Sequence, residues 1–147
     1  MSTLLADTIR KTGGTAGVDI RVKNTSVYES DGGTSVTQNL VQSLGKAWAL
    51  LDGTGTIALQ DSFNIASVSD ESTGDYIFTV SNAFSSANFS CTANGRQSES
   101  PAWTAMTSSV GATAATTVRI TSRNTSNTAT DQKQLHTQFM GDLALVQ

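Results

Sequence analysis

The sequence predicts a mainly β fold: a jelly-roll-like β-sandwich with one short N-terminal amphipathic helix and an extended N-terminal arm. Two observations predict it. Only 14% of the residues are charged and 37% are hydrophobic, and abundant Ser, Thr, Asn and Gly suit turns and β-surfaces better than a helical bundle. Apolar and polar residues also alternate in short runs between turn signals. We expect residues 1–34 to form the arm, with one strand and a connector, and residues 35–147 to form the helix and the β-domain.

The N-terminal third carries the arm and the helix signal. In the arm, Val18, Ile20 and Val22 alternate and predict a strand. A helix is predicted over residues 35–46, because apolar residues recur at helical spacing, and its opposite face is nearly uncharged. Such a helix can pack beside copies of itself or on its own sheet. The candidate oligomer-interface residues are Val36, Leu40, Val41, Leu44 and Trp48. Trp48 is assigned to the core or to this interface.

The β-domain is predicted from turns and alternation. Residues 63–80 form the clearest hairpin, since Tyr76, Phe78 and Val80 share one face after a polar loop at 70–75. Residues 95–115 are rich in Ser, Thr and Ala, and we expect a long surface loop with a short strand at 102–106. The chain then continues with strands at 117–122 and 135–146.

No residue pattern predicts an enzyme or a cofactor. Cys91 is the only cysteine and His136 the only histidine, and nothing around them resembles a nucleophile motif, so a small buried hydrophobe and a surface or interface imidazole are expected. Asp70, Glu71 and Asp75 gather on the hairpin loop. They lack the ligand spacing of a calcium loop, and acidic residues are common in turns, so no metal site is predicted, and a glycan hydrolase that uses one of these carboxylates is the weakest alternative.

Charge and hydropathy limit the partners. The net charge is −3, which gives no basic field for nucleic acid, and no stretch has the apolar length of a signal peptide or a membrane span. Trp103, in an irregular stretch, is a candidate receptor contact, although it could instead close one end of the sandwich.

One stretch resembles a known family. TQNLVQSLGKAWALLDGTGTIALQDSFNIASVSDESTGDYIFTV, from Thr37 to Val80, is similar to the TQNLxxGLAKAWxNFxGTGTxxIxDSFNVSSxxDxxTGxYxxxF segment of tail-fibre-like and virion structural proteins of marine tailed bacteriophages. The N-terminal LLADTIRKTGGTAGVDI is similar to the opening of many such proteins. Leu50 and Leu51 depart from the pattern, which has Asn-Phe there. The matching residues are Thr37, Gln38, Asn39, Leu40, Leu44, Lys46, Ala47, Trp48, Gly53, Thr54, Gly55, Thr56, Asp61, Ser62, Phe63, Asn64, Ser67, Asp70, Thr73, Gly74, Asp75 and Tyr76.

The resemblance implies a non-enzymatic virion component, a homotrimer assembled in the host cytoplasm. We expect a short tail fibre or fibre-head protein that acts in assembly and host attachment and contacts other virion proteins through its N-terminal arm. A capsid decoration, cement or head-fibre protein is an alternative, and a module that binds a host surface glycan is another. No catalytic residue comes with the family.

Overall fold

The computed structural model describes residues 27–29, 37–39, 43–97 and 107–144, and the chain divides into two compact units, Met1–Val41 and Gln42–Gln147. In the first unit, β1 (Val27–Glu29) and β2 (Thr37–Asn39) pair antiparallel, with Val27 opposite Asn39. The strand predicted around Ile20 lies outside the described residues.

The helix predicted over residues 35–46 is not formed by those of its residues that the structure describes. Residues 37–39 form β2, Ser43 and Leu44 form a turn and a bend, and the strand β3 begins at Ala47. No helix occurs anywhere in the described ranges. The helical spacing was misleading because Trp48 belongs to a strand of period two, whose pairing with two neighbouring strands overrides local propensity. Val36, Leu40 and Val41 lie outside the described residues.

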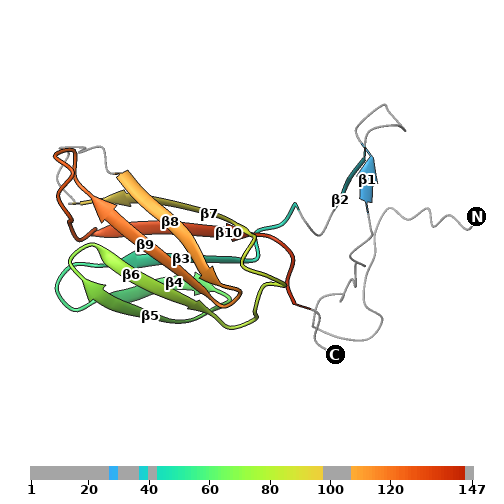
Figure 1. The fold of residues 1–147 in the computed structure, drawn as a ribbon, viewed down its shortest axis with the longest axis horizontal. Helices are drawn as coiled ribbons and strands as arrows, with labels where there is room; N and C mark the ends of the chain where they lie inside the picture. The colour runs from blue at the N-terminus through green and yellow to red at the C-terminus, as the bar shows by residue number, and fades with distance from the viewer. Residues whose placement is uncertain (1–26, 30–36, 40–42, 98–106, 145–147) are drawn as a thin grey trace, which may run out of the picture. The chain divides into compact units, whose positions relative to one another are not determined.

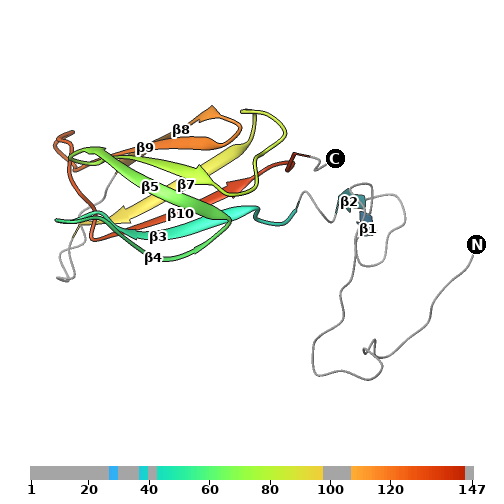
Figure 2. The ribbon, with the colours of Figure 1, turned by 90° about the horizontal axis from the view of Figure 1, so that it is seen from below.

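The described part of the second unit is built from eight strands. They are β3 (Ala47–Asp52), β4 (Ala58–Phe63), β5 (Ile65–Ser72), β6 (Asp75–Val80), β7 (Ser90–Arg96), β8 (Thr107–Ala114), β9 (Thr117–Arg123) and β10 (Gln134–Met140). They form two antiparallel sheets with the strand orders β4-β3-β10-β7 and β5-β6-β9-β8. Figure 2 shows the sheets as two layers, so the expected mainly β, sandwich-like architecture is confirmed.

The strand order is not that of a jelly roll. The consecutive strands β3 and β4, β5 and β6, and β8 and β9 pair as hairpins within one sheet, whereas the interleaved Greek keys of a jelly roll send successive strands to different sheets. Short turns explain the difference, since Thr73 and Gly74 alone separate β5 from β6 and leave no length for a crossing. The predicted hairpin at 63–80 is confirmed, with a tighter turn than expected.

The core lies between the two sheets and follows from strict alternation. β6 buries Tyr76, Phe78 and Val80, and Phe78 meets Phe139 of the opposite sheet edge to face, with ring centroids 6.2 Å apart. The other buried apolar residues are Ala47, Ala49, Leu51, Phe84, Val118, Ile120 and Leu135.

The described part of the stretch 95–115 differs from the prediction. Instead of a long loop, the chain forms β8 (Thr107–Ala114), which pairs with β9 along its length and places Val110 opposite Ile120. Small and β-branched residues suit a strand even without apolar alternation. The predicted short strand at 102–106 and Trp103 lie outside the described residues. The last predicted strand is shorter than 135–146, because β10 ends at Met140.

A buried polar cluster closes one end of the sandwich. Tyr76 is fully buried, and its hydroxyl donates to Asp131 Oδ1 at 2.9 Å, while the Gly74 N–H donates to the same oxygen at 2.6 Å. Gly53 lies against this hydroxyl so closely that an added Cβ would come within 2.2 Å of it. Three connections, after β3, after β5 and before β10, are therefore held together by one tyrosine.

The opposite end of the sandwich is where the chain enters β3 and leaves β10. Ala47, the first residue of β3, is paired with Phe139, and the Lys46 N–H donates to the Phe139 carbonyl at 2.9 Å. The two strands are antiparallel neighbours, so the incoming and outgoing chain lie side by side (Figure 1). The described part of the chain contains no helix with the length and apolar character needed to cross a lipid bilayer.

Candidate functional site

The outward surface of the sheet β4-β3-β10-β7 carries two rows of side chains. Because Ala47, Ala49 and Leu51 point into the core, the larger Trp48 and Leu50 point away from it. On β10, Leu135, Thr137 and Phe139 face inward and His136 and Gln138 outward. Cross-strand register aligns these residues into the rows Phe63, Trp48, Gln138, Thr92 and Asp61, Leu50, His136, Asn94, which we call the outer face.

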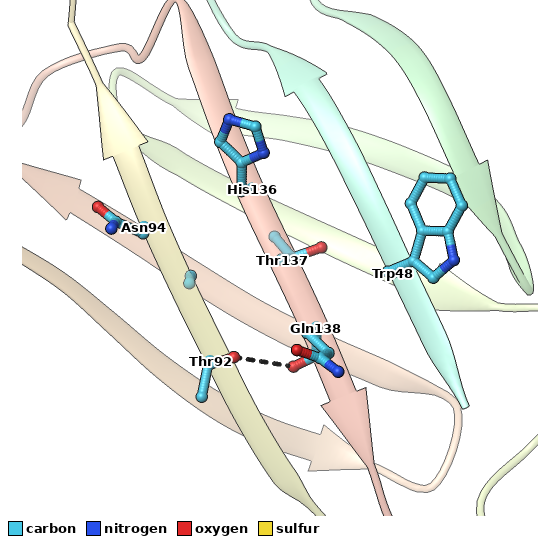
Figure 3. Close-up of a pocket in the computed structure, with 7 residues that line it drawn as sticks. Trp48, Thr92, Asn94, His136, Thr137 and Gln138 are labelled. Carbon is cyan, nitrogen blue, oxygen red and sulfur yellow. Dashed lines mark hydrogen bonds between the residues drawn. The ribbon is translucent and has the colours of Figure 1, made fainter. Parts of the chain in front are cut away.

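A depression of about 400 Å³ lies in the outer face, over β3, β10 and β7. Five of the seven residues that line it have exposed side chains: Trp48, Thr92, Asn94, His136 and Gln138. The other two are Ala93 and Thr137. Figure 3 looks onto these strands and shows the indole of Trp48 broad side on, at one edge of the group, with Asn94 and Thr92 at the other edge. The indole is 40% exposed.

The polar groups of the depression are largely free of protein partners. The Thr92 hydroxyl donates to the Gln138 backbone carbonyl at 3.4 Å (Figure 3). Within the described ranges, no hydrogen bond engages the side chains of Asn94, His136 or Gln138. Gly45 passes close to the Gln138 amide, since an added Cβ would lie 3.2 Å from its Nε2. The depression therefore combines one aromatic surface with hydroxyl, amide and imidazole groups that can bond a ligand.

Two exposed apolar side chains lie outside the lining of the depression. Phe63 is the cross-strand neighbour of Trp48 on β4 and is 54% exposed, and Leu44, four residues before Trp48, is 56% exposed. Of the predicted interface residues, Leu44 and Trp48 are thus both solvent-accessible in the single chain. The assignment of Trp48 to the core is wrong, and its assignment to an oligomer interface stays a prediction.

The residues considered for catalysis are kept apart. Cys91 pairs with the inward Phe139 and packs against the core, whereas His136 points outward, so the two side chains lie on opposite faces of the sheet. Burial raises the pKa of the Cys91 thiol to about 11, which keeps it protonated near neutral pH. The predicted surface position of His136 is confirmed.

Two acidic residues of the β5–β6 hairpin, Asp75 and Glu71, have hydrogen-bond partners on neighbouring residues. Arg119 Nε donates to Asp75 Oδ1 at 2.8 Å and its terminal nitrogen donates to Oδ2, which lowers the pKa of Asp75. The exposed Glu71 accepts a hydrogen bond from Ser69 Oγ at 2.8 Å. In the residues that the structure describes, no group of three or more His, Cys, Asp or Glu is arranged to hold a metal ion.

Comparison of the chain with protein-family models, with curated proteins and with solved structures finds no match. The outer face is therefore interpreted from its own chemistry. Sequence reasoning missed Thr92, Asn94 and Gln138. The alternation of Leu135, Thr137 and Phe139 with His136 and Gln138 was a signal that could have placed the last two residues on one outward surface.

Proposed function

We propose that this chain is a non-enzymatic structural component of a bacteriophage virion, a short tail fibre or fibre-head protein that acts in assembly and host attachment, with the outer face as its contact surface. The observation that carries the proposal is the outward indole of Trp48 beside unpaired amide and imidazole groups. A large aromatic residue in a solvent-exposed depression is typical of a binding surface, because it offers apolar area at little entropic cost.

The resemblance to virion proteins supports the proposal, and the structure gives several of the shared residues a physical role. Gly53, Gly74 and Tyr76 belong to the polar cluster at one end of the sandwich. Asn64, the one residue between β4 and β5, has a positive φ of 57°, and its side chain donates to the Lys46 carbonyl at 3.0 Å. These residues specify turns and corners, so the shared pattern describes a scaffold, and Trp48 and Phe63 are its outward aromatic residues.

Assembly would use a different part of the chain from attachment. The first unit, Met1–Val41, contains the predicted arm and three of the predicted interface residues, and Leu44 lies just after it. We propose a homotrimer formed through these residues, none of which lines the depression. Several weak contact sites on one particle would then bind a surface tightly through multivalency.

Two measurements test this function. Sedimentation of the purified full chain should give three times the mass of one chain, and a monomer would contradict the trimer. An antibody raised against the chain should label virions at the tail. Labelling of the capsid instead would favour the decoration or cement protein, and unlabelled virions would refute the proposed function.

A further inference from the structure

We infer that the outer face binds an uncharged oligosaccharide, with Trp48 stacking on one sugar ring and Asn94, His136 and Gln138 hydrogen-bonding its hydroxyl groups. The inference rests on the proposed function, because it names the ligand class of the same contact surface. It follows from the shape of the depression, from the kinds of group that line it and from the charges that the lining lacks.

The first step is the combination of groups. Small-molecule pockets are mostly apolar with a few polar groups, and this depression follows that pattern, with the indole of Trp48 beside four exposed polar residues: Thr92, Asn94, His136 and Gln138. A pyranose ring matches this pattern, since it has a flat face of C–H bonds and a rim of hydroxyls. The indole would cover the C–H face, and the amides and imidazole can both donate to and accept from hydroxyls.

The second step is the spacing. Trp48 on β3 and Thr92 on β7 are separated by β10, so they lie two strand spacings apart, or about 10 Å. This is about the length of a disaccharide. A ligand stacked on the indole could therefore reach Gln138 and His136 on the middle strand with its first ring, and Thr92 and Asn94 with its second.

The third step is charge. None of the seven lining residues is Lys, Arg, Asp or Glu. A sulfated, phosphorylated or sialylated glycan would lose part of its hydration on binding and would meet no fixed cation in the lining. A neutral glycan loses only hydroxyl hydration, which amides can replace, so the depression favours neutral sugars.

A second copy of this chain is a weaker occupant for the depression. A protein partner would bury the unpaired Asn94 and Gln138 amides and would need to satisfy each of them, at a cost for every group left unbonded. Mobile hydroxyls on a sugar satisfy such groups more readily. The apolar Leu44 and Phe63 lie outside the lining of the depression.

The test uses the purified full chain on an array of immobilised oligosaccharides of glucose, galactose, mannose and N-acetylglucosamine, with sialylated and sulfated glycans beside them. A neutral glycan that binds is then titrated by calorimetry up to about 10 mM, because single sites of this kind are expected to be weak. We expect Trp48→Ala to lower the affinity at least about tenfold, and Gln138→Ala and Asn94→Ala to lower it about threefold or more.

Two control variants make the result specific. Leu59→Ala removes an apolar side chain that is 39% exposed on β4, outside the depression, and should leave the affinity unchanged. Trp103→Ala compares the outer face with the receptor contact predicted from the sequence: a smaller loss of affinity than Trp48→Ala supports the outer face, and an equal or larger loss contradicts it. Each variant must first show the same sedimentation behaviour and melting temperature as the unaltered protein. A loss of binding is then not caused by a loss of folding.

The inference is overturned if no neutral glycan binds, if only charged glycans bind, or if Trp48→Ala binds as well as the unaltered chain. It is also overturned if Trp48→Ala dissociates the oligomer, since the indole would then lie between copies. Virion labelling is independent of these outcomes: a labelled virion with no glycan bound refutes the ligand alone, whereas a bound glycan with unlabelled virions refutes the virion role alone.

Discussion

Tyr76→Phe removes one oxygen atom from the buried polar cluster and tests whether the cluster stabilises the fold. The Tyr76 side chain is fully buried, and its hydroxyl donates to Asp131 Oδ1 at 2.9 Å and lies 3.4 Å from the Gly53 carbonyl oxygen. The ring itself stays in the core in the variant. The change in the free energy of unfolding therefore reports the hydroxyl rather than a cavity.

The expected loss of stability follows from the hydrogen-bond partner of the Tyr76 hydroxyl, which is the carboxyl group of Asp131. A hydrogen bond to a carboxyl group contributes about 1.5–3 kcal/mol to folding, so we expect the variant to be about 2 kcal/mol less stable at pH 8. For a domain near the size of the second unit, this lowers the melting temperature by about 8 °C. Urea denaturation of both proteins measures the difference.

The difference in the free energy of unfolding between Tyr76→Phe and the unaltered protein should become smaller above pH 10. Burial, followed by the hydrogen bond to Asp131 and its charge, raises the pKa of Tyr76 above its ordinary value near 10. The unfolded chain then loses this proton at a lower pH than the folded one, so the stability from the neutral phenol is complete below pH 10 and is lost as the pH rises above it. At pH 11, one unit above the pKa of the unfolded tyrosine, the stability lost is about 1.4 kcal/mol, and the variant does not suffer this loss. The gap should therefore narrow from about 2 to about 0.6 kcal/mol at pH 11.

Asp131→Asn serves as a control, because the amide oxygen still accepts from Tyr76 and from Gly74. It should lower the free energy of unfolding by less than Tyr76→Phe does. Its stability should still fall above pH 10, as that of the unaltered protein does. A Tyr76→Phe variant within about 0.5 kcal/mol of the unaltered protein at pH 8 would refute the stabilising role, since surface changes alone give differences of that size. A gap that stays constant to pH 11 would refute the pKa assignment.

Three further outcomes are expected. Gly74→Ala should destabilise the protein far more than Gly55→Ala in urea denaturation: both have a positive φ, but a Cβ at position 74 meets three backbone atoms at 2.6–2.9 Å and one at 55 meets nothing. Equal losses would contradict this. Cys91 should react with a thiol reagent at pH 8 at least about a hundredfold more slowly in the folded than in the unfolded chain, because burial raises its pKa to about 11, and equal rates would exclude that environment. Asp75→Asn should lower the free energy of unfolding by no more than about 1 kcal/mol, and by less in high salt, because the Arg119 side chain is half exposed. A larger loss that does not depend on salt would show that the ion pair is stronger than this geometry implies.

The sequence predicted those parts of the fold whose signals are local. The hairpin around Gly74 follows from a turn residue and from Tyr76, Phe78 and Val80 in alternation, and neighbouring residues decide both. β8 could not be found in this way, because its sequence TSSVGATA holds a single large apolar residue, Val110. β8 is a strand because it pairs with β9, and the sequence of β8 alone does not reveal this pairing.

The sequence did not reveal the candidate site, because the alternation in β3 does not show which set of residues faces the core. In AWALLD, at positions 47–52, both sets of alternate residues are apolar, so the pattern does not say whether Trp48 or Ala49 faces the core. The choice is made by β10, which brings Phe139 and Leu135 to the inward side of Ala47 and Leu51. Small residues inside and a large one outside is the reverse of the usual expectation, and it is the arrangement that exposes the indole.

The position of Trp48 also has a mechanical consequence. It stands one residue after the start of β3, at the end of the sandwich where the chain enters, and it is opposite Gln138, near the point where β10 ends. If a bound surface pulls on Trp48 while the preceding chain is anchored, the tension runs through a few covalent bonds and does not cross the core. The hairpins β5–β6 and β8–β9 lie in the other sheet and carry no tension. A module built in this way can resist detachment at the strength of its ligand contact without first being unfolded.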